Sequence, residues 1–144
     1  MRFLVINGPN LNWLGRREPS IYGAKTPGDI EAAVSERARE LDVEVDFFQS
    51  NHEGELVDAI HAARGRCAGI VVNPGAFTHY AWAIHDALAA FEGPVVELHL
   101  SNPAAREPWR HTSVVAPVAS GTIAGFGGAG YRMAVEAVAD LLDG

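Results

Sequence analysis

The most chemically informative part of this sequence is one strand end and the loop that follows it. Residues 93–100 (GPVVELHL) are apolar and β-prone after a Gly-Pro pair, which predicts a strand. Alternate residues of a strand point to the same face, so Glu97 and His99 are expected side by side. A carboxylate fixes the tautomer of a neighbouring imidazole and suits it to proton transfer near neutral pH. Arg106 and Arg110 follow within one loop and could hold an anionic ligand.

Each of these four residues alone would be interpreted as a solvated surface group. Their occurrence together at the end of an otherwise apolar strand favours a functional site, so the elements that position them become important. Apolar strand-like runs alternate with helical runs along the chain, and the strands are too apolar to face water. We therefore expect an α/β fold, a flavodoxin-like three-layer sandwich with a five-stranded parallel sheet. The expected strands are residues 2–7, 43–49, 67–73, 95–100 and 121–125, and the expected helices are 26–41, 53–64, 78–90 and 129–142.

Polar residues gather at the carboxyl ends of these expected strands, which is where open parallel sheets bind ligands. They are Asn7, Asn10, Asn73, His79, His99 and Ser101. Thr78 is the expected N-cap of the helix that follows the third strand, so His79 would lie in a first helical turn, which favours anions. This gathering of residues from distant parts of the chain predicts a single ligand site.

The connection between the first strand and the first helix, residues 8–23, is long for a compact domain. It contains several Gly and Pro residues together with Arg16, Arg17 and Tyr22, which predicts an active-site lid at about residues 15–25. An arginine held against Tyr22 would favour the ionised phenol and so create a base. The alternative for this loop is a packed tyrosine beside solvated arginines.

Composition limits the classes of function. The 144 residues correspond to one domain, 1–144, and 48% hydrophobic with 20% charged residues is typical of a globular protein. A net charge of −7 without a basic stripe predicts no nucleic-acid partner, and no apolar run is long enough to predict a membrane span. The chain begins directly on a strand and Cys67 is its only cysteine, so we expect no signal peptide and a cytoplasmic location.

Three other signals are weak or misplaced. The histidines lack metal-ligand spacing, so no metal is expected. Residues 125–130 match the dinucleotide motif GxGxxG, but no strand follows to supply a ribose-binding acid, so we interpret them as a turn that allows close packing. Lys25, the only lysine, is poorly placed to form an imine. A phosphorylation receiver domain would share the strand pattern. Such domains have a pair of acidic residues after the first strand and a lysine after the fifth, and this sequence has neither.

Together these segments resemble the type II 3-dehydroquinate dehydratase family over almost the whole chain. The matching motifs are NGPNLN (7–12), LGRREPxxYG (14–23), NPGAFTH (73–79), ELHLSN (97–102), RExWR (106–110) and GTIAGFGxxGY (121–131). The resemblance implies a hydro-lyase that needs no cofactor and dehydrates 3-dehydroquinate to 3-dehydroshikimate by anti elimination through an enolate. It implies a role in the shikimate pathway of aromatic amino acid biosynthesis. Quinate breakdown is the alternative within the family, and a non-catalytic anion-binding or receiver-like module is the alternative from another class.

The resemblance also implies a role for each matching residue. Tyr22 would remove the C2 proton, and Arg17 would keep Tyr22 ionised. His99, oriented by Glu97, would protonate the departing C1 hydroxyl, and Asn10 would stabilise the enolate oxygen through water. The implied substrate-binding residues are Asn73, His79, Leu100 through its backbone, Ser101 and Arg110, with Arg106 supporting the closed lid.

Asp86 corresponds to a position that reaches a neighbouring subunit's site in the family, which implies homotrimers that usually assemble into a homododecamer. It also lies seven residues after His79, which predicts that the two share one helix face. Trp13 and Trp109 differ from the leucine and the smaller aromatic residue that are common in the family. Both residues flank the site, so these differences from the family would affect lid packing and inhibitor preference rather than the chemistry.

Overall fold

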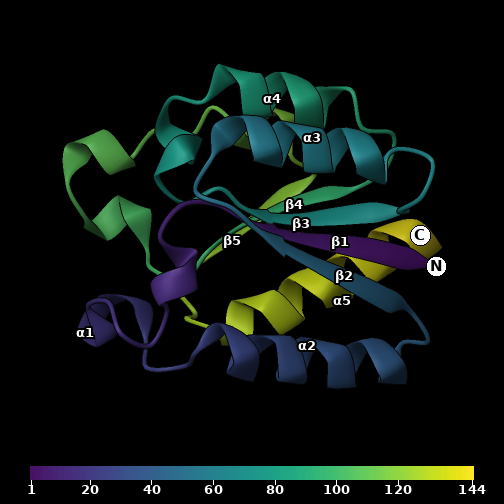
Figure 1. Ribbon diagram of the computed structural model, residues 1–144, viewed down its shortest axis with the longest axis horizontal. Helices are drawn as coiled ribbons and strands as arrows, with labels where there is room; N and C mark the ends of the chain where they lie inside the picture. The colour runs from purple at the N-terminus through teal and green to yellow at the C-terminus, as the bar shows by residue number, and fades with distance from the viewer.

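A five-stranded parallel sheet forms the centre of the computed structural model, which describes residues 1–144 (Figure 1). The strands are β1 (Arg2–Asn7), β2 (Glu44–Gln49), β3 (Gly69–Asn73), β4 (Val95–His99) and β5 (Gly121–Ala124). Their order across the sheet is β2-β1-β3-β4-β5, and every neighbouring pair is parallel. This is the strand order of flavodoxin-like doubly wound folds, so the expected fold class is confirmed.

Helices cover both faces of the sheet and complete the three layers (Figure 1). On one face lie α2 (Pro27–Glu40) and α5 (Ala129–Asp143), and on the other lie α3 (Glu53–Ala63) and α4 (Trp82–Ala89). The single turn α1 (Pro19–Tyr22) lies outside these layers. Short 3₁₀ turns are formed by Leu11–Trp13, Gly75–His79, Pro103–Ala105, Pro108–Arg110 and Ala116–Val118. None of the helices combines the length and the apolar character that crossing a membrane requires.

The central strands β1, β3 and β4 are largely apolar because both of their faces are buried, whereas the edge strands β2 and β5 are partly exposed. In β1, Phe3 and Val5 belong to the core under α2 and α5, whereas Leu4 and Ile6 belong to the core under α3 and α4. None of these four residues is more than 3% exposed. Burial on both sides is the physical reason why the sequence showed continuous apolar runs instead of alternation.

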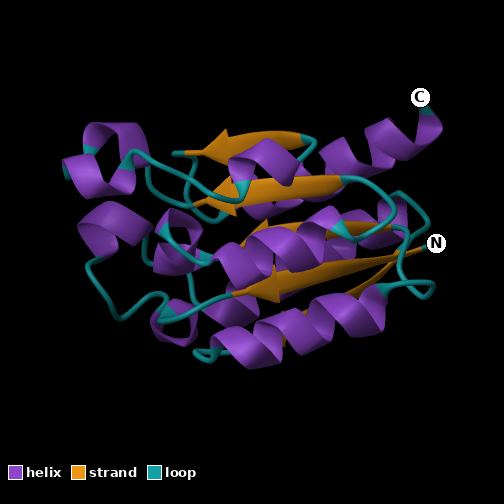
Figure 2. Cartoon of the chain, turned by 90° about the horizontal axis from the view of Figure 1, so that it is seen from above, coloured by secondary structure: helices purple, strands orange, loops and turns teal.

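The carboxyl ends of all five strands meet at one edge of the sheet, which lies on the left in Figure 1. Figure 2 shows from above that the visible strand arrows point toward this same end, and every neighbouring pair is parallel. The chain leaves β1 for β2 on one side and later enters β3 on the other side, so the strand order reverses between β1 and β3. Ligands of open α/β sheets bind outside such a reversal point.

The start of α4 differs from the sequence prediction. Thr78 lies inside the 3₁₀ turn Gly75–His79, and α4 begins only at Trp82, with no side-chain cap. The expected N-cap was therefore wrong. The physical reason is that the Thr78 hydroxyl has another partner, because it donates a hydrogen bond of 2.5 Å to the carboxylate of Glu97.

The glycine-rich turn at residues 125–130 joins β5 to α5 and serves close packing, as expected. A Cβ atom added to Gly130 would lie only 2.7 Å from the Leu98 side chain in the sheet beneath. Gly125 and Gly127 adopt φ angles of 96° and 60°, which residues with side chains rarely adopt. The turn therefore lets the first residues of α5 approach the sheet closely.

Candidate active site

A pocket lies at the carboxyl edge of the sheet, where the strand order reverses. All of the expected site residues line it except Asn7, Glu97 and Asp86. Three arginines and two histidines line the pocket and no carboxylate does, so it suits a small anionic ligand. The lining residues are Pro9, Asn10, Leu11, Arg17, Tyr22, Asn73, Gly75, Ala76, His79, His99, Leu100, Ser101, Pro103, Arg106, Trp109 and Arg110.

Glu97 lies directly behind His99 and is completely buried. Its Oε2 is 2.5 Å from Nε2 of His99, so the expected side-by-side arrangement on β4 is confirmed. Because a carboxylate accepts, Nε2 of His99 carries a hydrogen and Nδ1 remains for a ligand. His99 lines the pocket whereas Glu97 does not, so Glu97 contacts a ligand only indirectly, through His99.

Two hydroxyl groups that were not recognised in the sequence complete the surroundings of Glu97. The Thr78 hydroxyl donates to Oε2, and the Ser113 hydroxyl lies 3.0 and 2.9 Å from the two carboxylate oxygens. Ser113 Oγ also accepts the backbone N–H groups of Val115 and Ala116, at 3.1 and 3.0 Å, so its own hydrogen is available to Glu97. Ser113 stands in no recognisable motif, and Thr78 had been interpreted as a helix cap.

These donors hold Glu97 in its ionised form. Burial by itself raises the pKa of this carboxyl, but the hydrogen bonds from His99, Thr78 and Ser113 outweigh burial, and the pKa of Glu97 lies below its ordinary value. The buried carboxylate therefore provides a counter-charge for His99 whenever its imidazole carries a second proton.

We expect Thr78→Val to destabilise the fold by about 1 to 2 kcal/mol at neutral pH, because it removes a hydrogen bond to a buried charge. The lowered pKa of Glu97 stabilises the fold fully above the unfolded value of about 4.3, and this stabilisation is lost as the pH falls through the lower folded pKa. The difference between variant and parent should therefore shrink in that acidic range. Urea unfolding at a series of pH values measures it.

The matched control for this prediction is Thr122→Val, which removes a hydroxyl from an exposed position on β5. This control should change the free energy of unfolding little at any pH. A Thr78→Val loss that stayed constant from neutral pH to pH 3 would contradict the assigned link to Glu97.

Tyr22 ends α1 and lies between two arginines. The guanidinium carbon of Arg17 is 4.6 Å from the centroid of its ring, and that of Arg106 is 5.1 Å away. Arg17 is the expected neighbour of Tyr22, and the contact of Arg106 with this residue of the lid segment is compatible with the lid-supporting role that the family resemblance implies for Arg106. Nη1 of Arg106 also donates a hydrogen bond of 3.2 Å to Ser101, so this arginine joins the lid segment to the loop after β4.

The opposite wall is held together by contacts among His79, Trp109 and Arg110. Nδ1 of His79 lies 2.7 Å from the carbonyl oxygen of Thr112, so it carries a hydrogen and leaves Nε2 for a ligand. Trp109 meets His79 edge-on at 5.3 Å, and the Arg110 guanidinium lies 4.0 Å over the indole. Arg110 also pairs with the carboxylate of Glu107. The large Trp109 thus contacts both His79 and Arg110 in the wall of the pocket.

Asn73 and Asn10 supply neutral polar groups to the pocket. Oδ1 of Asn73 accepts the backbone N–H of Gly75 at 3.1 Å, and Nδ2 donates to the Tyr131 hydroxyl at 3.0 Å. One amide hydrogen and one lone pair of Asn73 therefore remain for a ligand. Asn10 has a left-handed backbone with φ 68°, and its N–H donates to the Asn51 side chain, which fixes the turn that carries it.

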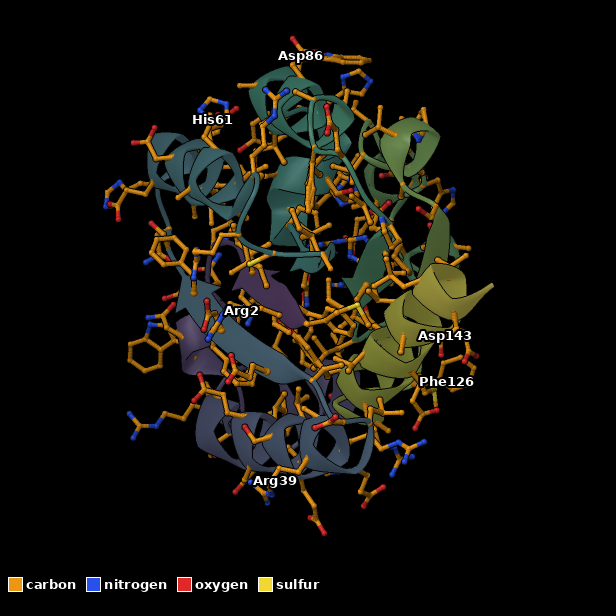
Figure 3. The ribbon with its side chains drawn as sticks, turned by 90° about the vertical axis from the view of Figure 1, so that its right-hand side faces the viewer. Arg2, Arg39, His61, Asp86, Phe126 and Asp143 are labelled. Atoms are coloured by element: carbon orange, nitrogen blue, oxygen red, sulfur yellow. The ribbon has the colours of Figure 1, made fainter.

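Asp86 lies outside the pocket of its own chain. Its side chain is 82% exposed and pairs only with the neighbouring His85, at 2.9 Å. Figure 3 shows Asp86 on the outer side of α4, pointing away from the molecule. The expected shared face with His79 was wrong, because His79 precedes α4. A contribution of Asp86 to a neighbouring subunit stays a prediction.

Comparison with known proteins assigns the family. The family model described as "Dehydroquinase class II" matches residues 1–139. The chain is 58% identical over 139 residues to "3-dehydroquinate dehydratase 2" of Pseudomonas putida, covering 96% of this chain and 93% of that protein. It is 58% identical over 136 residues to "Catabolic 3-dehydroquinase 1" of Aspergillus terreus, covering 94% and 90%.

A solved structure agrees with these sequences. The crystal structure of type II dehydroquinase from Butyrivibrio crossotus superposes with a TM-score of 0.93 at 46% identity, covering 96% of this chain and 97% of that chain. Sequence motifs, strand order and overall structure thus agree along nearly the whole length. The chain therefore belongs to the class II dehydroquinase family.

Proposed function

We propose that this chain is a 3-dehydroquinate dehydratase, which converts 3-dehydroquinate to 3-dehydroshikimate and water without a cofactor. One observation carries the proposal: a single basic pocket holds Tyr22 between two arginines and also holds His99 backed by an ionised Glu97. The tyrosine is suited to accept a proton and the histidine to donate one. The surrounding arginines suit the carboxylate of the substrate.

The first step assigned to the site is removal of a proton from C2. The Tyr22 phenolate takes this proton, and the electron pair of the C2–H bond moves to form an enolate at the C3 oxygen. Arg17 provides positive charge beside the phenolate, at 4.6 Å from the tyrosine ring. Asn10, acting through a water molecule, would stabilise the enolate oxygen.

The second step is loss of the C1 hydroxyl. The C3 carbonyl re-forms, the C1–C2 double bond forms, and the C1–O bond breaks as His99 delivers a proton, so that the hydroxyl leaves as water. Because Nε2 of His99 is bonded to Glu97, Nδ1 is the nitrogen that would deliver this proton. Tyr22 comes from the lid and His99 from the sheet, an arrangement that supports an anti elimination with base and acid on different sides.

The remaining groups would bind the substrate. Nε2 of His79, the free amide hydrogen of Asn73, and the stacked Arg110 would bind its carboxylate and hydroxyls. Ser101 and the backbone of Leu100 would bind on the side of β4. Residues 15–25 would act as the lid of a single catalytic domain, 1–144, with Arg106 holding the lid closed through Tyr22.

The assay that tests this function follows ultraviolet absorbance. Purified protein mixed with 3-dehydroquinate should produce the absorbance of a conjugated enone, and protein denatured by heat should not. A folded protein that bound the substrate without producing the enone would instead support a non-catalytic anion-binding module.

We place the reaction in the shikimate pathway in the cytoplasm. The Pseudomonas putida relative carries no catabolic designation and is matched over 96% of this chain. Quinate breakdown is the second candidate, because the name of the Aspergillus terreus relative is catabolic. Deletion of the gene should make growth depend on added aromatic amino acids. A deletion strain that lost only growth on quinate would favour the catabolic role.

A mechanism without an imine predicts that borohydride, added with the substrate, leaves the activity intact. Lys25→Ala should also retain most of its turnover, because the only lysine lies outside the pocket. Mass spectrometry of borohydride-treated protein is the accompanying measurement. A substrate-derived adduct on Lys25 would overturn the enolate mechanism.

The assembly proposed for this chain is a homotrimer, four of which would form a homododecamer. Its purpose would be to bring the exposed carboxylate of Asp86 to a neighbouring subunit's pocket. Light scattering should then give a mass that is a multiple of three subunits, and Asp86→Ala should lower kcat/KM without unfolding the protein. A fully active monomer would contradict the shared site.

A further inference from the structure

A buried chain of hydrogen bonds ends at one of the pocket residues. Asn7 in β1 and Asn73 in β3 are register partners at the carboxyl ends of adjacent strands. The Tyr131 hydroxyl lies between them, donating to Oδ1 of Asn7 at 2.6 Å and accepting from Nδ2 of Asn73 at 3.0 Å. Only Asn73 lines the pocket; Asn7 and Tyr131 border a separate cavity on the side of α2.

In this series of hydrogen bonds, the donor and the acceptor of each bond follow from the groups on either side of it. The phenol of Tyr131 is completely buried, which raises its pKa, so it has one hydrogen to donate. Asn7 receives that hydrogen, and a lone pair of the phenol oxygen is left for the amide of Asn73. The backbone N–H of Gly75 donates to Oδ1 of Asn73, so the oxygen of this amide is also fixed in place. Reversing the amide would set its NH2 group against the N–H of Gly75, two donors, and its oxygen against the lone pair of the Tyr131 phenol, two acceptors.

The glycine-rich turn explains how Tyr131 reaches this position. Tyr131 lies in the first turn of α5, directly after Gly130, whose absent side chain leaves room for Leu98 of β4. A methyl group at residue 130 would lie 2.7 Å from Cδ1 of Leu98, so either this buried side chain or the start of α5 would have to shift. The proposed chemistry makes no use of this glycine motif, so its close packing has to serve another purpose.

We propose that Tyr131, oriented by Asn7, is a positioning residue that fixes the amide of Asn73 with a donor N–H directed at the substrate. The glycine-rich turn at 125–130 exists to bring the Tyr131 hydroxyl between the two asparagines. This inference rests on the proposed function, because dehydration of 3-dehydroquinate is the reaction in which it is measured.

Steady-state kinetics of Tyr131→Phe are the first test. The ring keeps its packing, but the amide of Asn73 loses its partner and can reverse, so KM should rise about tenfold with a smaller change in kcat. Asn7→Leu should raise KM to a similar extent, because the phenol hydrogen is then no longer directed away from Asn73. Asn7→Asp keeps an acceptor and should keep KM near the parent value. The matched control is Tyr80→Phe, at a residue that is 60% exposed and outside the pocket.

The decisive measurement repeats Tyr131→Phe in an Asn73→Ala background. If Tyr131 acts only through Asn73, it has no amide left to position once residue 73 is alanine. The double variant should therefore have the same KM as the single variant Asn73→Ala. A further rise in KM in that background would overturn the inference, as would an unchanged KM in the single variant Tyr131→Phe. A lower melting temperature with unchanged KM would show a purely structural hydroxyl. If the parent protein itself gives no enone from 3-dehydroquinate, the proposed function fails instead, so the two failures are distinguishable.

Discussion

Tyr22→Phe should leave a folded protein whose kcat is lower by a factor of roughly 10² to 10⁴, the contribution of a general base. The substitution removes one hydroxyl and keeps the ring, so the contacts of Arg17 and Arg106 with the ring face remain possible. The Tyr22 hydroxyl makes no hydrogen bond within the fold, and the residue ends a single helical turn. The free energy of unfolding should therefore change little. KM should also change little, because the ring still closes the pocket.

The matched control for this prediction is Ser20→Ala in the same turn, which removes an exposed hydroxyl that does not line the pocket. Turnover of this control should be close to that of the parent, which would separate loss of the base from a disturbed lid. Circular dichroism and a thermal melt establish that both variants are folded. A folded Tyr22→Phe protein with nearly normal turnover would show that another group removes the C2 proton.

Most of the fold was predictable because burial leaves a simple pattern in the strands. Each of the central strands β1, β3 and β4 lies under helices on both faces, so it appears in the sequence as a short, mainly apolar run between polar segments. The helix expected at residues 26–41 is also confirmed as α2, and its start is stabilised by reciprocal capping hydrogen bonds between Thr26 and Asp29. Local chemistry and tertiary packing agree at these positions.

Prediction failed where a side chain uses a distant partner. Thr78 has the residue type of a helix cap, but its hydroxyl contacts Glu97 on another strand, and nothing in the local sequence reveals this. The same is true of Ser113 and of Tyr131, whose hydroxyl reaches residues at the ends of two strands. Groups that touch the pocket were recognisable by their types and motifs, and Glu97 by its two-residue spacing from His99, whereas the roles of Thr78, Ser113 and Tyr131 depend on the three-dimensional arrangement alone.

His99→Ala should lower kcat by a factor of roughly 10² to 10⁴, because it removes the group assigned to protonate the departing hydroxyl. Glu97→Gln should have a smaller effect. The glutamine keeps an oxygen that can accept from both Nε2 of His99 and the hydroxyl of Thr78, but its amide nitrogen then replaces Oε1 and meets the hydroxyl of Ser113, and the negative charge behind the imidazole is lost. Circular dichroism and urea unfolding should accompany the kinetics, since Glu97 is completely buried.

The double variant distinguishes the two possible relations between these residues. Glu97 does not line the pocket, so any effect it has on turnover has to pass through His99 at a distance of 2.5 Å. In a His99→Ala background, Glu97→Gln should therefore cost almost nothing more, as expected for residues that act as a unit. If the two losses multiply instead, Glu97 affects the reaction by another route, such as the placement of β4. If His99→Ala is nearly silent, the proton comes from elsewhere and the pair only stabilises the end of this strand.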